Sequence, residues 1–355
     1  GLRCISILAV IVYHATGPHG PTSPLLKLGI AGVTLFFTIS GFLITTLLLR
    51  EQQAYGRIDL PAFYVRRSLR IFPLYYLVLL LYVLLVWLVE PDAALRSRFF
   101  ENLPAFATYT SNWFVDLDGD RVIFFYAWSL ATEEQFYLFW PSVEQHARGA
   151  SPWLMLLLIV FVELTWVEAI PMNTSGLIHR VILSFAPAIG FGVILAHLMH
   201  NERPFRRLRV VLGHRATAAI ALIALAVSVA FGAPELVVCG IMAMLVGACC
   251  MREDNTLARA LRWPLVARAG TVSYGMYLMH MLFLKLARLS CEKLGITNQW
   301  VQFAVGLALV FASAWVSYNT YESWFLKLKL RFARGEQPRP SAPTPGSESS
   351  ELGTA

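Results

Sequence analysis

Long apolar runs constrain this chain more than any other feature of its sequence. About ten runs approach or exceed the roughly 20 residues that a helix needs to cross a bilayer. Charged residues make up only 14% of the chain, whereas a soluble domain normally carries about 25%. The sequence therefore predicts an all-α, polytopic membrane bundle of about ten transmembrane helices. The predicted spans are 2–16, 29–49, 71–89, 123–141, 153–170, 180–200, 217–233, 235–251, 271–288 and 300–320.

The distribution of positive charge predicts which loops face the cytoplasm. With ten spans and a cytoplasmic N-terminus, 21 of the 29 Lys and Arg residues lie inside and 8 lie outside. Because cytoplasmic loops normally hold the excess of Lys and Arg, both termini are expected in the cytoplasm. The outside residues are Lys27, Arg96, Arg98, Arg121, Arg180, Lys285, Arg288 and Lys293. Topology and anionic lipid headgroups then account for the net charge of +7 without a nucleic-acid partner.

The chain divides into one membrane domain, 1–325, and a tail, 326–355. The tail is basic at first and then rich in Pro, Ser, Gly and Glu, a composition typical of disorder. No second folded domain is expected after it. No basic segment precedes the first span, so this span is not interpreted as a cleaved signal peptide. The five cysteines show no metal-ligand spacing and are interpreted as small buried hydrophobes, so no metal is expected.

The first span carries Arg3 near one end and His14 near the other. Eleven residues correspond to about 1100° of helix, so both side chains lie on nearly the same face, about 16 Å apart along the axis. Polar groups on one stripe of a membrane helix normally face the bundle interior or a water-filled cavity. The alternative is that Arg3 reaches the headgroups and His14 sits at the outer interface.

Basic residues cluster at the expected cytoplasmic start of the third span. Arg66, Arg67 and Arg70 precede Pro73, and Arg67 and Arg70 are three residues apart. Two guanidinium groups on one helix face suit phosphate groups. A cluster that only sets the topology is the alternative.

Two adjacent glutamates, Glu133 and Glu134, lie inside the apolar and aromatic fourth span. Such carboxylates are costly in lipid, so at least one is expected to be buried in protein with a partner. One of them could orient a histidine, act as acid or base, or carry protons. A structural ion pair with an arginine is the alternative.

Two further spans carry polar or small residues. In the second span, Gly32, Ser40 and Gly41 are expected to allow close helix packing, and the threonines and Ser40 to bond within their own helix. His280, in the ninth span, is interpreted first as a structural residue and second as part of a site.

Six pieces of sequence occur in a fixed order along the chain. They are GLR…YH, GVTLFFTISGFLIT, RRSLRIFPLYY, YTSNW, WSLATEEQFYLFWP and SYGMYLMH. Together they resemble the acyltransferase-3 family of integral membrane proteins, the bacterial glycan and sugar O-acyltransferases, over about residues 1–325. The resemblance implies a multi-pass protein of the cell inner (plasma) membrane. Its function would be to move an acyl group, with acetyl expected, from cytoplasmic acyl-CoA to a hydroxyl of a cell-surface glycan or glycosylated metabolite.

The resemblance also implies roles for the residues singled out above. His14 would be the general base or relay, and Arg3 its partner that contacts the donor, acetyl-CoA or another acyl-CoA. Arg66, Arg67 and Arg70 would bind the coenzyme A phosphates. Glu133 and Glu134 would be the paired catalytic glutamates, with Glu133 favoured. Direct transfer and a covalent acyl-histidine both stay open.

One position departs from the family pattern. The family usually has an acidic residue after the Gly-Val of the second span, where this chain has Thr34. If that acid orients the histidine, its role has moved to Glu133 or is absent, and a non-catalytic family member stays an alternative. A proton-coupled transporter is the other alternative, although it would need a repeated pair of broken helices.

Overall fold

The structure, a computed structural model, describes residues 1–15, 24–117, 121–174 and 176–332 of the 355-residue chain. Every regular element in these ranges is helical, and they contain no strand. The prediction of an all-α fold is therefore confirmed.

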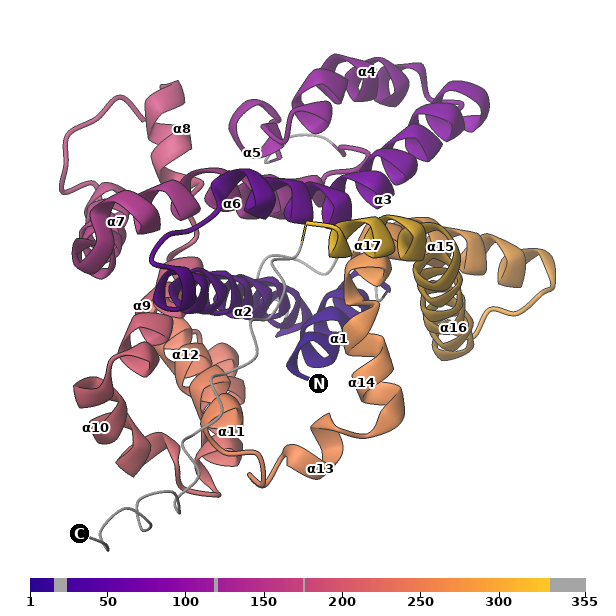
Figure 1. Cartoon of the computed structure of the whole chain (residues 1–355). Helices are drawn as coiled ribbons and strands as arrows, with labels where there is room; N and C mark the ends of the chain where they lie inside the picture. The colour runs from indigo at the N-terminus through magenta and orange to yellow at the C-terminus, as the bar shows by residue number, and fades with distance from the viewer. Residues whose placement is uncertain (16–23, 118–120, 175, 333–355) are drawn as a thin grey trace, which may run out of the picture.

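The helices follow one another with short connections (Figure 1). The first half contains α1 (Leu2–Ala15), α2 (Pro24–Tyr55), α3 (Leu60–Val89), α4 (Ala93–Ala107), α5 (Ser111–Phe114), α6 (Ala127–Ala147), the 3-10 turn η1 (Arg148–Ala150) and α7 (Ser151–Trp166). The second half contains α8 (Leu177–Leu183), α9 (Pro187–His200), α10 (Glu202–Leu212), α11 (Thr217–Phe231), α12 (Glu235–Met251), α13 (Ala258–Leu261), α14 (Pro264–Thr271), α15 (Ser273–Lys293), α16 (Gln299–Ser317), the π-helical turn η2 (Tyr318–Glu322) and α17 (Ser323–Leu330).

Each of the ten apolar runs contains at least one helix, but fewer are long and apolar enough to cross a membrane alone. Three helical stretches meet that requirement, Lys27–Tyr55, Leu60–Val89 and Gln299–Lys329, and up to five do if each of two bent pairs forms one span. Helices α1, α7 and α12 are too short, with 14, 16 and 17 residues. Helices α6 and α15 are long enough but carry several charged side chains. Ten spans and cytoplasmic termini stay predictions.

Helices α1 and α2 lie at the centre of the bundle (Figure 1). Helix α2 packs along α9 and α1 and also contacts α6 and α12, while α1 contacts α14 and α15 as well. Gly41 faces the Ile189 carbonyl and Gly192 faces the Thr38 carbonyl, with no space for a Cβ at either position. The close packing predicted for the small residues of the second span is confirmed.

Polar side chains of α2 have two kinds of partner. The hydroxyls of Thr34 and Thr38 donate to the carbonyls four residues earlier, at 2.9 and 3.1 Å, as predicted. The prediction is wrong for Ser40, whose hydroxyl donates to the Glu133 carboxylate. Because α6 packs beside α2, this hydroxyl finds a stronger, charged acceptor across the helix interface.

The domain boundary expected at residue 325 falls inside α17, which contacts α3. Residues 333–355, most of the expected tail, lie outside the described residues. Near this end of the described chain, the Tyr321 hydroxyl donates to the Pro73 carbonyl at 3.2 Å.

Candidate active site

Helix α1 reaches two cavities. The larger, of about 900 Å³, is called here the histidine cavity because His14 lines it. Its other walls come from the C-terminal half of α3, the segment 121–126, and helices α15 and α16. The smaller, of about 60 Å³, is called the arginine cavity and lies among α1, α2, α3, α6 and α15. Arg3 lines it, so the one stripe predicted for α1 connects two separate cavities.

The arginine cavity brings together residues that are far apart in the sequence. Its charged lining consists of Arg3, Arg67, Arg70, Glu133 and Glu134. This is five of the seven residues that sequence reasoning selected. In the part of the chain that the structure describes, the side chains of Arg3, Arg70 and Glu134 make no hydrogen bond or ion pair, so these groups are available to a ligand.

Arg66 does not line the arginine cavity. Its Nη2 lies 3.2 Å from Glu51 Oε2, and its Nη1 donates to the Phe332 carbonyl at 3.0 Å. Adjacent residues on a helix point about 100° apart, so Arg66 and Arg67 cannot both face one cavity. The structure therefore gives Arg66 a structural ion pair.

Glu133 holds Arg67 in place. The hydroxyls of Ser40 and Tyr137 both donate to Glu133 Oε1, and Arg67 Nη2 lies 3.8 Å from the same oxygen. The Arg67 guanidinium carbon also lies 3.6 Å from the centre of the Tyr137 ring, a cation–π contact. Arg67 Nε is buried and has no hydrogen-bond partner. The carboxylate and the ring thus fix the guanidinium while one of its N–H groups stays unsatisfied.

His14 contacts a second histidine in the wall of the histidine cavity. His14 Nδ1 lies 3.0 Å from the Val10 carbonyl and 3.2 Å from His280 Nε2. His280 Nδ1 lies 2.5 Å from the Tyr277 carbonyl, which can only accept a hydrogen bond. In a neutral His280, Nδ1 therefore carries the hydrogen and Nε2 accepts from His14. This arrangement leaves His14 Nε2 as the nitrogen with the lone pair.

His280 is the functional candidate that sequence reasoning placed second. It is completely buried, and its ring lies 4.8 Å from that of His14 between centres. Glu133, which was expected to replace the missing acid at Thr34, instead lines the other cavity. The signal in the sequence was a histidine inside an apolar span, but nothing in the sequence showed that it faces α1.

A layer of hydrogen-bonded side chains lies between the two cavities. Ser129 and Tyr277 line the arginine cavity, and Tyr126 lines the histidine cavity. Ser129 Oγ lies 2.5 Å from the Tyr277 hydroxyl oxygen, and each of these oxygens lies 3.1 Å from the Tyr126 carbonyl. A ligand that extends from one cavity to the other has to displace this layer.

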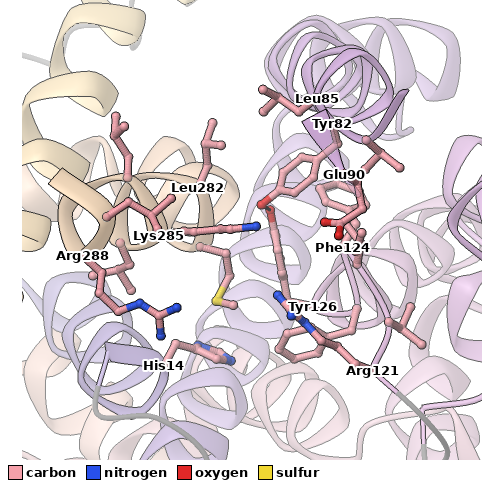
Figure 2. A pocket seen from close by; sticks show the side chains of 18 of the residues that line it. His14, Tyr82, Leu85, Glu90, Arg121, Phe124, Tyr126, Leu282, Lys285 and Arg288 are labelled. Atoms are coloured by element: carbon pink, nitrogen blue, oxygen red, sulfur yellow. Dashed lines mark hydrogen bonds between the residues drawn. The ribbon is translucent and has the colours of Figure 1, made fainter. Parts of the chain in front are cut away.

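Positive side chains surround the histidine cavity. Figure 2 shows Arg121, Lys285 and Arg288 pointing into it from different walls, with His14 and Tyr126 toward one end. Glu90 is the one acidic residue among the described residues of the lining. This charge was not expected from the sequence, because Arg121 lies more than 150 residues from the other two.

The two bent helix pairs lie away from both cavities. Helices α8 and α9 meet at a bend of 46°, and α10 and α11 at a bend of 77°. None of the described residues that line either cavity comes from these helices. The bends therefore do not form a binding site of the kind that broken helices form in transporters.

Comparison with known proteins places this geometry in a family context. A family model described as "Acyltransferase domain" matches residues 1–319. Over 310 residues, the chain is 30% identical to a putative peptidoglycan O-acetyltransferase, YrhL, of Bacillus subtilis (strain 168). That match covers 79% of this chain and 47% of the relative.

Other relatives match a shorter part of the chain. Over 150 residues, it is 33% identical to the peptidoglycan O-acetyltransferase OatA of Listeria monocytogenes, covering 40% of this chain and 23% of the relative. A putative O-acetyltransferase of Staphylococcus aureus (strain COL) is 36% identical over 150 residues, 40% of this chain and 24% of the relative. The matches thus span a quarter to a half of the relatives' length. No solved structure gives a significant match.

Proposed function

The chain belongs to the acyltransferase domain family, and on that premise we propose that it is a membrane O-acyltransferase. It moves an acyl group, acetyl in the simplest case, from acyl-CoA to a hydroxyl of a cell-surface glycan or glycosylated metabolite. The observation that carries this proposal is α1, which presents Arg3 to one cavity and His14 to the other. Since the Listeria relative is named as a peptidoglycan O-acetyltransferase, peptidoglycan fragments are the first acceptors to test.

The arginine cavity is the donor side of this proposal. Coenzyme A is anionic and cytoplasmic, and Arg3, Arg67 and Arg70 supply guanidinium groups that suit its phosphates. In the proposed topology, the charge distribution of the loops puts Arg67 and Arg70 at the cytoplasmic side of the inner membrane. Glu133 acts there as a positioning residue for Arg67, and Glu134 remains open to a ligand.

The histidine cavity is the acceptor side. An acceptor hydroxyl gives its proton to His14 Nε2, and its oxygen forms a bond to the thioester carbonyl carbon. The carbon–sulfur bond then breaks, and the coenzyme A sulfur leaves with the proton from His14. A positioned base of this kind contributes about 10²–10⁴-fold to a rate. His280 holds the His14 ring in the tautomer that this step needs.

The arginine cavity has to widen when the donor binds. Its volume of about 60 Å³ is far below the roughly 300–1,000 Å³ of typical ligand pockets. Ser129 and Tyr277 lie on the path from this cavity to His14, and their mutual hydrogen bond is the contact to be broken. Donor binding and opening of this layer are thus coupled in the proposal.

Purified protein in lipid nanodiscs, given acetyl-CoA and peptidoglycan fragments, tests the function. The expected result is release of free coenzyme A together with an acceptor that gains the mass of one acetyl group. Coenzyme A and acceptor that both remain unchanged, on peptidoglycan fragments and on the envelope glycans of the source cells, would contradict the proposal. Movement of solute across vesicles without ester formation would favour the transporter alternative.

A further inference from the structure

The charge of the histidine cavity is unbalanced. Its lining contains three fixed cations, Arg121, Lys285 and Arg288, and one carboxylate, Glu90. The Glu90 carboxylate is engaged by its own backbone, since Oε1 accepts from the Asp92 N–H at 3.4 Å. Among the described lining residues, the positive charge of this cavity is therefore in excess.

These cations are free to meet a ligand. Arg288 forms an ion pair with Glu292 at 3.5 Å, but both side chains are more than half exposed, and such pairs contribute little. Arg121 and Lys285 are exposed and form no ion pair with any described residue. The three side chains point into the cavity from two opposite walls (Figure 2), because Lys285 and Arg288 lie one turn apart on α15 and Arg121 precedes α6. An anion between the walls would be contacted from both sides.

The location of these residues argues against a role in topology alone. In the predicted orientation, only 8 of the 29 Lys and Arg residues lie on the outer side, where positive charge is normally depleted. Three of those eight line this one cavity. The same cavity contains His14, and the Phe125 ring lies 5.5 Å from the His14 ring between centres, which offers a face for a sugar ring.

We propose that the histidine cavity takes an acceptor that carries a negative charge, a carboxylate or a phosphate, bound by Arg121, Lys285 and Arg288. The anchored charge holds a neighbouring hydroxyl of the same acceptor at His14. This inference rests on the proposed function. The anion has two possible sources: a carboxylate within the glycan, or a phosphate that links the glycan to a lipid carrier.

Envelope glycans from cells that make the protein, separated by charge and analysed for O-acetyl esters by mass spectrometry, test the inference. Esters that depend on the chain are expected in the anionic fraction. Mild acid, which cleaves the phosphate link to a lipid, separates the two sources: esters that leave the lipid indicate the phosphate, and esters on a lipid-free polymer indicate the carboxylate. Esters on neutral glycans would overturn the inference and leave the proposed function intact. Esters in no fraction would contradict the proposed function itself.

A charge variant provides the second arm. The triple variant Arg121→Gln, Lys285→Gln, Arg288→Gln is expected to lower ester formation on the anionic fraction by about tenfold or more, since each charged hydrogen bond has a large effect. Lys293→Gln, on the same helix but outside the cavity, is the matched control and is expected to have no effect. An unchanged melting temperature shows that the triple variant is folded. A folded triple variant with the wild-type ester yield would overturn the inference.

Discussion

His280 Nε2 lies 3.2 Å from Nδ1 of His14, and the two histidines come from helices at opposite ends of the chain. The hydrogen bond of His280 Nδ1 to the Tyr277 carbonyl makes this a directional relay rather than a simple contact. It leaves His14 Nε2 as the acceptor nitrogen of the histidine cavity. The predictions below start from this pair and from the arginine cavity on the other side of the Ser129–Tyr277 layer.

Replacement of His280 by Ala is expected to lower kcat by about tenfold or more while the KM for acetyl-CoA stays unchanged. His280 is a positioning residue: without it, His14 Nδ1 keeps only the Val10 carbonyl, and the ring is free to adopt the wrong tautomer. His280→Gln, which retains a side-chain acceptor, should recover part of the loss. Steady-state kinetics of the two variants check this, and a raised KM with normal kcat would contradict it.

The arginines of the arginine cavity should differ from their neighbour Arg66. Arg3→Gln and Arg70→Gln are each expected to raise the KM for acetyl-CoA by about tenfold, the effect of one lost charged hydrogen bond. Arg66→Gln is the matched control, because Arg66 pairs with Glu51 outside the cavity. Equal effects of all three substitutions on KM would show that the cavity does not distinguish them.

Glu133 is expected to matter more for stability than its neighbour Glu134. Glu133→Ala leaves Arg67 and the hydroxyls of Ser40 and Tyr137 without their shared acceptor, at a cost of about 1–3 kcal/mol. Glu134 forms no hydrogen bond to a described residue, so Glu134→Ala should cost less. Denaturation of both variants in mixed micelles measures the difference. A larger loss for Glu134→Ala would contradict this account.

The contact of α2 with α9 predicts a packing effect away from both cavities. Gly41→Ala puts a methyl group against the Ile189 carbonyl and is expected to destabilise the fold by about 1–3 kcal/mol. Gly149→Ala is the control, since no atom lies near the position of its Cβ. The melting temperatures of the two variants give the comparison, and equal values would contradict the close packing.

The sequence predicted the elements better than their partners. Apolar runs gave the helices, and helical spacing put Arg3 and His14 on one stripe, because both properties depend only on local periodicity. The pairing of His14 with His280 depends on which helices are neighbours, which no local pattern contains. Ser40 looked like a packing residue for the same reason, since its acceptor Glu133 lies 93 positions away.

The charged residues show a second limit of the sequence. Arg66, Arg67 and Arg70 looked like one phosphate-binding group, but the rotation between adjacent positions turns Arg66 toward Glu51. The histidine cavity combines Arg121 with two residues of α15, and only the folded chain brings them together. Charge and composition therefore identified the candidates, whereas helix packing decided which of them share a cavity.

The central claim, that α1 carries the base for acyl transfer, is tested most directly by His14→Ala. The measurement is the yield of O-acetyl esters from acetyl-CoA on the envelope glycan that the wild-type protein modifies, with His200→Ala, an exposed histidine at the end of α9, as the control. We predict a fall of about 10²-fold or more for His14→Ala, with an unchanged melting temperature, and a normal yield for the control. A folded His14→Ala protein that forms esters at the wild-type rate would contradict the account.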